Sequence, residues 1–293
     1  MKKVLVLGGT RFFGRKLVEL LVAEGHAVTI VTRGKLENPF KGKVKHIIVD
    51  RRDELAFRQA VGSLDFDLVY DNICYSPNEA KVLCDIFNGK INKLVFTSTL
   101  STYEADGVSK SEGDFDPYSH EIRIGNTEDF TYGEGKRQAE AVFFKYAKFP
   151  VVAVRFPIVM GLDDYTKRLH FHVERIVKGE PIGFVNLDAR MSFILAEEAA
   201  DFLLWAGAND IEGPFNATAN GTISIKELIT MIEATAEQQA KIAVVGNDEI
   251  RSPYAVPASW FMTTEKAQKA GFQFSNLDDW LPGLVKDIVA QYH

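Results

Sequence analysis

A tyrosine and a lysine stand one helical turn apart in the segment TYGEGKRQAE, residues 131–140. If this segment is helical, Tyr132 and Lys136 project from the same face. A tyrosine hydroxyl has a reference pKa of about 10, so acid–base catalysis near neutral pH requires a lower value, and a neighbouring ammonium lowers it. Such a pair also arises readily by chance, so the spacing alone does not establish this chemistry.

Two hydroxyl side chains end another apolar run. Ser98 and Thr99 follow the apolar residues in VFTSTLSTY, residues 95–103. The Tyr132–Lys136 pair begins the helical pattern that leads to the next apolar run, VVAVRF at residues 151–156. Ligands of a parallel sheet bind beyond the carboxyl ends of its strands. We therefore expect the hydroxyls and the pair to meet in one crevice.

A glycine-rich segment, GGTRFFG, lies between the apolar run KVLVL and a helical pattern. Small residues at this place let backbone N–H groups and a helix N-terminus approach a pyrophosphate. The alternative is a plain tight turn, but the order of strand, loop, helix and second strand favours dinucleotide binding. The expected cofactor contacts in this segment are Gly8, Gly9, Thr10, Arg11, Phe12, Phe13 and Gly14.

The end of the second apolar run predicts which dinucleotide is preferred. An acidic residue there bonds the 2′-hydroxyl of NAD, whereas an arginine accommodates the 2′-phosphate of NADP. In VTIVTRGK the acidic residue is missing: Thr32 and Arg33 take its place, and Lys35 is close by. Arg11 would add a second guanidinium, so we expect NADP to be preferred over NAD. If Arg33 is instead solvated and Arg11 packs on the adenine or pairs with Asp50, NAD remains acceptable.

The elements that position these residues are six apolar runs separated by helical patterns. The runs begin at residues 3, 27, 45, 66, 93 and 151. Several lack polar–apolar alternation, as expected for strands covered on both faces of a parallel sheet. The predicted fold is α/β, a doubly wound parallel sheet with a smaller C-terminal α/β lobe. We expect a dinucleotide-binding domain at residues 1–155 and a mainly substrate-binding lobe at 156–293, interleaved with the sheet domain.

Composition limits the partners. The chain of 293 residues has a net charge of −6 with dispersed basic residues, so neither nucleic acid nor a membrane surface is an expected partner. The two cysteines, Cys74 and Cys84, match no zinc pattern or disulfide framework and favour the reducing cytoplasm. His170 and His172 lack a third matched ligand, so no metal is expected. A small-molecule substrate fits best, and the chain is compatible with a homodimer.

Several of these segments resemble the extended short-chain dehydrogenase/reductases of the NAD-dependent epimerase/dehydratase family. YGEGKRQAE is similar to that family's Y-G-x-x-K-x-x-x-E segment, and FTSTLSTY to its S-[ST]-x-x-x-Y strand end. The resemblance implies that Thr99, with Ser98 adjacent, orients the substrate oxygen, and that Tyr132 exchanges its proton. It also implies that Lys136 lowers the tyrosine pKa and holds the nicotinamide ribose.

The resemblance extends over nearly the whole chain. VDRRD is similar to the third-strand segment that contacts adenine, which implies cofactor contacts at Asp50 and Arg51. Arg190, and less directly Arg251, match arginines that hold the phosphates of a nucleotide-sugar. The alternative for both arginines is a solvated surface charge.

The chain also departs from the family pattern. Ile158 stands where UDP-sugar epimerases have an asparagine, which argues against a UDP-sugar. Leu100 and Ser101 replace the acidic pair that follows the catalytic threonine of 4,6-dehydratases, which disfavours that class. GGTRFFG and YDNICY also resemble an atypical branch that includes chloroplast stem-loop RNA-binding proteins.

Two function hypotheses remain. The first is a nicotinamide-dependent oxidoreductase or epimerase that acts on a hydroxyl or carbonyl of a sugar-like substrate, either free or nucleotide-linked. Epimerisation results if the ketone is reduced again in place, and net oxidation or reduction if the cofactor leaves. The alternative is a cofactor-binding non-enzymatic protein or an RNA-binding protein of the same fold.

Overall fold

The computed structural model describes residues 1–245 and 248–292. The strands are β1 Lys3–Leu7, β2 Ala27–Thr32, β3 Lys45–Ile48, β4 Leu68–Asp71, β5 Lys93–Thr99, β6 Val151–Phe156, β7 Ile158–Met160, β8 Pro181–Phe184, β9 Arg190–Met191, β10 Phe193–Leu195, β11 Gly213–Asn216, β12 Ile223–Ser224 and β13 Lys241–Val244. The α-helices are α1 Phe12–Ala23, α2 Glu54–Val61, α3 Pro77–Phe87, α4 Tyr132–Tyr146, α5 Arg168–Lys178, α6 Ala196–Ala208, α7 Ile225–Ala236, α8 Glu265–Lys269 and α9 Leu277–Val289.

The main sheet has seven strands in the order β11-β6-β5-β4-β1-β2-β3, and all neighbouring strands are parallel. The predicted doubly wound sheet is thus confirmed. The strand order reverses between β1 and β4, so the loops after these two strands diverge and leave a crevice. The glycine segment follows β1 and residues 72–76 follow β4, which places both at this crevice.

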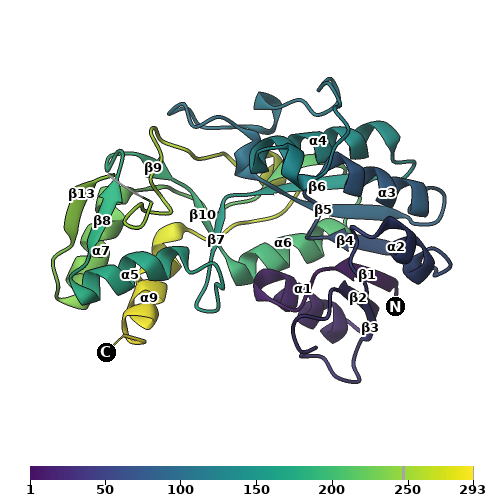
Figure 1. The fold of residues 1–293 in the computed structure, drawn as a ribbon, viewed down its shortest axis with the longest axis horizontal. Coiled ribbons are helices and arrows are strands. Elements are labelled where there is room, and N and C mark those ends of the chain that lie inside the picture. Colours follow the sequence, from purple (N-terminus) through teal and green to yellow (C-terminus); the bar gives the residue numbers. More distant parts are fainter. Residues whose placement is uncertain (246–247, 293) are drawn as a thin grey trace.

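Helices cover both faces of the sheet (Figure 1). Helices α1 and α6 pack together on one face, where Val18 and Phe202 contact the strand residues Val6 and Ile30 in one buried cluster. Helices α2, α3 and α4 cover the other face. Burial on both faces explains why the strand sequences are continuously apolar.

A smaller lobe stands beside the sheet, on the left of Figure 1. It has its own apolar core from α5, α7 and α9 together with the strand pairs β8–β13 and β9–β12. A capping box starts α7, in which Ser224 and Glu227 each bond the other's backbone N–H.

Residues after 155 contribute to the sheet as well as to the lobe. β11 pairs with β6 at the sheet edge, and α6 covers α1. Because β11 contains Pro214, which cannot donate a ladder hydrogen bond, an edge position suits it. Among the described residues, no helix is long and apolar enough to cross a membrane.

Candidate active site

The glycine segment forms a cradle that larger residues would fill. Gly8 and Gly9 have φ values of 77° and 139°, which favour glycine. A Cβ at Gly8 would lie 2.9 Å from Ile73 Cγ2, and one at Gly9 would lie 3.0 Å from Val18 Cγ2. Helix α1 has no side-chain cap and no acidic residue in its first turn, so its N-terminal N–H groups and dipole are available to an anion.

The backbone conformation of Arg11 in this loop does not require glycine. Its backbone is extended, with φ −137° and ψ 151°. The left-handed conformation falls instead on Phe12, with φ 50°. A non-glycine residue in that region stores roughly 1–3 kcal/mol of strain, which is typical of functional loops.

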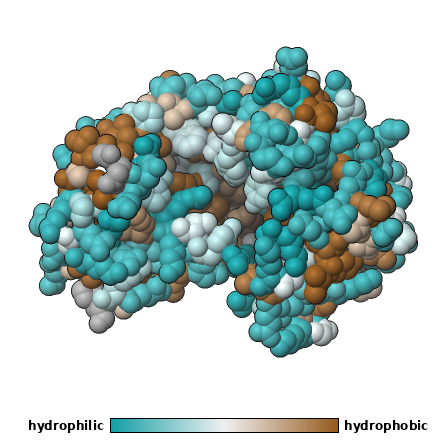
Figure 2. Space-filling view, in the orientation of Figure 1, coloured by the Kyte–Doolittle hydropathy of each residue, from teal (hydrophilic) through white to brown (hydrophobic). Residues whose placement is uncertain are grey.

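Two adjoining cavities occupy the crevice between the sheet and the lobe, where the surface is hollowed in Figure 2. The first, which we call the Arg33 cavity, has a volume of 420 Å³ and is lined by Thr10, Thr32, Arg33, Lys35 and Asp50, among others. The second, the Tyr132 cavity, has a volume of 320 Å³ and is lined by Gly9, Phe12, Phe13, Gly14, Thr99, Tyr132 and Lys136, among others. The two cavities share Gly8, Arg11, Ile73, Tyr75 and Tyr165, so one elongated ligand would extend through both.

Asn72 offers a buried donor to such a ligand. Its Oδ1 accepts a hydrogen bond from Thr97 Oγ1 at 2.8 Å, while its Nδ2 has no partner among the described residues. A buried amide N–H group without an acceptor destabilises the fold by about 1–3 kcal/mol. A phosphate or ribose oxygen that accepted its hydrogen bond would remove this penalty. With the glycine cradle and the free start of α1, the residues present fit a nicotinamide dinucleotide.

The Arg33 cavity has a mixed charge. The backbone N–H of Arg52 donates to Asp50 at 3.0 Å and holds the pKa of Asp50 below its usual value, with the cations of Arg52 and Arg33 adding to the effect. Thr32 bonds His46 Nε2 through its hydroxyl at 2.8 Å. Arg33 itself is exposed and lines the cavity.

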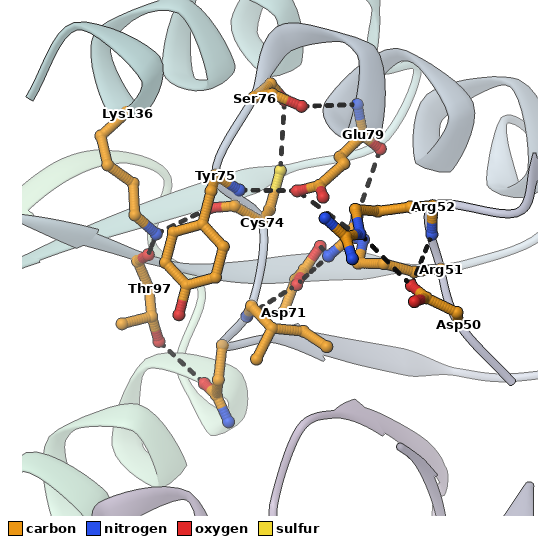
Figure 3. Close-up of polar contacts among 12 residues, drawn as sticks. Asp50, Arg51, Arg52, Asp71, Cys74, Tyr75, Ser76, Glu79, Thr97 and Lys136 are labelled. Atoms are coloured by element: carbon orange, nitrogen blue, oxygen red, sulfur yellow. Dashed lines mark hydrogen bonds and ion pairs between the residues drawn. The ribbon is translucent and has the colours of Figure 1, made fainter. Parts of the chain in front are cut away.

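Arg51, an expected cofactor contact, is engaged mainly with carboxylates of the protein. Its guanidinium is buried and donates to both carboxylate oxygens of Asp71 at 2.6 and 2.8 Å, and to the Glu79 carbonyl at 3.2 Å (Figure 3). Glu79 in turn accepts from the backbone N–H of Tyr75 at 2.7 Å. Arg51 lines the Arg33 cavity and pairs with Asp71 at the end of β4 and with Glu79 in α3, because two buried carboxylates need a cation. Its Nε has no hydrogen-bond partner among the described residues.

Thr99 and Tyr132 are brought together in the Tyr132 cavity. Tyr132 is the first residue of α4 and its phenol interacts with Thr99, which ends β5 and whose hydroxyl donates to Ser101 at 3.3 Å. Although 56% of Tyr132 is exposed, its hydroxyl lies among protein atoms, and this burial raises its pKa. The bond to Thr99 and the nearby Arg168 cation oppose that rise.

Lys136 is oriented differently from the expectation. Its ammonium is 1% exposed and donates to the carbonyl oxygens of Cys74 and Thr97, each at 2.7 Å (Figure 3). The Tyr75 ring lies against it, with the ring centroid 4.6 Å from Nζ. Burial lowers the pKa of Lys136 to about 8. The expected lowering of the Tyr132 pKa by Lys136 is therefore not found, since the ammonium is held by carbonyl groups instead.

Ser98 has a partner within the protein. Its hydroxyl donates to Glu140, which is fully buried and bonds Arg155 at 3.1 and 2.6 Å. Arg155 also donates to the Tyr103 hydroxyl at 2.7 Å. Ser98 thus lines the Tyr132 cavity and donates its hydroxyl proton to a buried polar network that fixes α4 against β5 and β6.

The two arginines expected to bind substrate phosphates lie away from both cavities. Arg190 donates to the Thr222 hydroxyl and carbonyl at 2.9 and 2.6 Å and pairs with Glu227 at 3.1 Å. Its donors hold the start of α7, and the expected phosphate contact stays a prediction. Arg251 is exposed, on a segment that bridges to Gly183.

His170 and His172 lie on α5 and are buried. His172 interacts with the Ser252 hydroxyl at 2.7 Å and with the Arg168 carbonyl at 2.8 Å, and burial lowers its pKa to about 4. Across residues 1–245 and 248–292, no group of three potential metal ligands occurs.

Sequence reasoning missed several residues of the crevice. They come from the loops after β4 and β7 and from the start of α5, namely Asn72, Tyr75, Asp164, Tyr165 and Arg168. Asn72 and Tyr75 follow a strand closely, so they could have been predicted from the rule that ligands bind beyond the carboxyl ends of parallel strands. The others follow a short strand of the lobe, for which the apolar pattern carried no comparable signal.

Comparison with known proteins supports the resemblance. Residues 4–76 match the model of the NAD dependent epimerase/dehydratase family. The chain is 30% identical over 206 residues to the chloroplast stem-loop binding protein of 41 kDa b of Arabidopsis thaliana, covering 65% of this chain and 51% of that protein. It is 26% identical over 266 residues to the UDP-glucuronic acid decarboxylase 1 of the same plant, covering 82% of this chain and 60% of that protein.

Solved structures share the fold over almost the whole chain. A putative epimerase from Burkholderia cenocepacia superposes with a TM-score of 0.77 at 19% identity, covering 99% of this chain and 98% of that chain. A UDP-glucose 4-epimerase from Thermus thermophilus, in complex with NAD, gives 0.72 at 18% identity with the same coverage. A dTDP-glucose 4,6-dehydratase from Bacillus anthracis, also with NAD, gives 0.74 at 13% identity, covering 100% and 96%. Residues 4–76 are thus similar to the NAD dependent epimerase/dehydratase family, the whole chain has the fold of these solved epimerases and the dehydratase, and it spans about half to three fifths of the length of the curated relatives it matches.

Proposed function

We propose that the chain is a nicotinamide-dependent oxidoreductase or epimerase that acts on a hydroxyl or carbonyl of a nucleotide-linked sugar. The observation that carries this proposal is the contact between Thr99 and Tyr132 in a cavity that continues past the glycine cradle into the Arg33 cavity. A proton-transfer group thus stands at one end of a crevice that fits a dinucleotide. The UDP-glucuronic acid decarboxylases among the relatives, and the epimerases among the solved structures, support the substrate class.

Each residue has a role in this proposal. Tyr132 takes the proton of the substrate hydroxyl as a carbonyl forms and returns it when the carbonyl is reduced. Thr99 orients the substrate oxygen beside the phenol. A bound nicotinamide accepts or supplies the hydride. Arg168 stabilises the phenolate form of Tyr132 by its charge, and the buried Lys136 fixes the Cys74 and Thr97 carbonyls that shape the cavity wall.

The residues after Thr99 and at position 158 limit which reactions of the family we propose for this chain. A 4,6-dehydratase is disfavoured because Leu100 and Ser101 supply no carboxyl group after Thr99, even though a solved 4,6-dehydratase shares the fold. Ile158 argues against the asparagine contact of UDP-sugar epimerases, so the nucleotide of the substrate stays open.

We propose NADP as the preferred cofactor. No acidic side chain ends β2, whereas Arg33 and Lys35 line the Arg33 cavity. The Asp50 carboxylate near Arg33 is the main opposing feature, since it would repel a 2′-phosphate. The free, buried cysteines support a reducing compartment such as the cytoplasm.

A second candidate is RNA binding by a chain of the same fold. The chloroplast stem-loop binding protein at 30% identity favours it. The net charge of −6 opposes it, because phosphate neutralisation supplies most of the affinity for RNA.

The test is a survey of bound nucleotides. The purified chain is analysed by mass spectrometry for retained dinucleotide and then titrated with NAD, NADP and a stem-loop RNA at two salt concentrations. The proposal predicts dinucleotide binding and no tight RNA binding. Salt-dependent, sub-micromolar RNA binding without dinucleotide binding would favour the second candidate.

A further inference from the structure

Arg11 reaches across the crevice to the lobe-side loop. Its guanidinium carbon lies 5.1 Å from the centroid of the Tyr165 ring, within the range of a cation–π contact. Arg11 belongs to the glycine segment after β1, and Tyr165 to the loop between β7 and α5. Both side chains are exposed, and Tyr165 is 57% exposed. Neither is needed to complete an apolar core.

The loop that carries Tyr165 is anchored on both sides. Asp164 accepts from the backbone N–H of Thr166 at 2.8 Å and from its hydroxyl at 2.7 Å. Gly161 leaves room for the Phe12 ring, since a Cβ there would lie 2.9 Å from it. On α1, Lys16 lies 3.9 Å from Asp163. These contacts hold Tyr165 opposite Arg11.

Arg11 and Tyr165 lie at the junction of the two cavities. Arg11 and Tyr165 each line both the Arg33 cavity and the Tyr132 cavity, so they stand where the two cavities meet. A dinucleotide has its adenosine and nicotinamide halves joined by a pyrophosphate. A ligand extending through both cavities would place this pyrophosphate at their junction, beside the cradle of Gly8 and the start of α1.

We propose that Arg11 and Tyr165 form a clasp across the crevice, in which Arg11 binds the dinucleotide pyrophosphate and Tyr165 holds the guanidinium over it. A planar guanidinium donates to phosphate in a bidentate manner while its face stacks on an aromatic ring. The inference rests on the proposed cofactor use. Binding of the pyrophosphate is distinct from recognition of the 2′-phosphate, because the pyrophosphate is common to NAD and NADP.

The test measures affinities and dissociation rates of NADH and NADPH by nicotinamide fluorescence. Arg11→Gly is expected to weaken both cofactors by the same factor, roughly 10-fold or more, mostly through faster dissociation. Tyr165→Ala is expected to weaken both by roughly 3-fold to 10-fold. Tyr165→Phe should bind both cofactors nearly as tightly as the wild type, because it keeps the ring face. Arg11→Lys should bind more tightly than Arg11→Gly but less tightly than the wild type, because an ammonium cannot make the bidentate contact.

Controls and a double variant separate the outcomes. Arg15→Ala removes a nearby surface guanidinium that pairs with Glu19, and is expected to change neither affinity. Arg11→Gly combined with Tyr165→Ala should be no weaker than Arg11→Gly alone, because the ring acts through the guanidinium. Circular dichroism confirms that each variant is folded.

Three results would overturn the clasp while leaving the proposed function intact: unchanged affinities in Arg11→Gly, a loss confined to NADPH, or fully additive effects in the double variant. Absence of dinucleotide binding by the wild type would overturn both.

Discussion

The Lys136 ammonium lies under the Tyr75 ring, 4.6 Å from its centroid, with two of its protons donated to the Cys74 and Thr97 carbonyls. Through these hydrogen bonds the buried ammonium stabilises the wall of the Tyr132 cavity. It links the loop after β4 to β5, the two segments that carry Tyr75 and Thr99. Its charge state is therefore tied to the stability of the fold.

This burial predicts a stability change with pH. The pKa of Lys136 is lowered to about 8 in the folded chain from its ordinary value of 10.5. Between these values the unfolded chain binds more protons than the folded chain, so this residue makes the free energy of unfolding rise with pH. Lys136→Met lacks the contribution. The wild-type free energy of unfolding minus that of Lys136→Met should increase by roughly 2–3 kcal/mol across this window. A difference that stays constant in denaturant titrations would show that the ammonium is not desolvated.

Ser98 and Thr99 are neighbours with different predicted roles. Ser98→Ala removes a hydrogen bond to the buried Glu140 and should lower the free energy of unfolding by about 1–2 kcal/mol, with turnover close to wild type. Thr99→Ala should leave stability nearly unchanged and lower turnover by roughly 10-fold to 100-fold, because the substrate oxygen loses its orienting group. Denaturant titration and steady-state kinetics on both variants distinguish these roles, and an inverted pattern would return the catalytic role to Ser98.

Arg168 is predicted to set the pH range of the reaction. Its cation opposes the rise that burial causes in the Tyr132 pKa. In Arg168→Gln the pKa of Tyr132 rises further, so the rise of the oxidation rate with pH should move to higher pH. Rates measured from neutral to alkaline pH, with Arg175→Gln on the same helix as the control, check this. An unshifted profile would mean that Arg168 does not act on the phenol.

Arg33 is predicted to favour NADP. Arg33→Ala should weaken NADP by roughly 10-fold or more and leave NAD nearly unaffected, because only NADP has the 2′-phosphate that a guanidinium would bind. Calorimetric titration of both cofactors checks it. Equal wild-type affinities for NAD and NADP, or no loss in the variant, would contradict the NADP preference.

The sequence predicted the framework better than the side-chain contacts. Five of the six predicted strands were visible because burial on both faces makes them continuously apolar. The sixth, β3, was visible from its apolar run although it lies at the sheet edge and is exposed or half-buried. β11 was missed because GPFN contains glycine, proline and asparagine, and only pairing with the distant β6 makes it a strand. Helix α4 was predicted with Tyr132 and Lys136 near its start, and both lie in the crevice as expected.

Three of the expected site residues have protein partners far along the chain. Arg51 turns toward Asp71, Ser98 toward Glu140, and Arg190 toward Thr222. A motif gives the position of a residue on the backbone, but not whether a buried carboxylate elsewhere takes its donor. The pairing of Arg11 with Tyr165 is equally long-range, so the glycine segment alone could not reveal it.

The most direct test of the proposed function is turnover of nucleotide-sugars by the wild type and Tyr132→Phe. Each protein is incubated with NAD or NADP and a panel of nucleotide-sugars, and products are separated by chromatography and identified by mass spectrometry. We predict that the wild type oxidises, reduces or epimerises at least one of them. Tyr132→Phe should bind the cofactor nearly as well but lower turnover by at least about 100-fold. Equal turnover by Tyr132→Phe would contradict the assigned proton transfer, and no turnover of any nucleotide-sugar together with tight, salt-dependent RNA binding would contradict the proposed function itself.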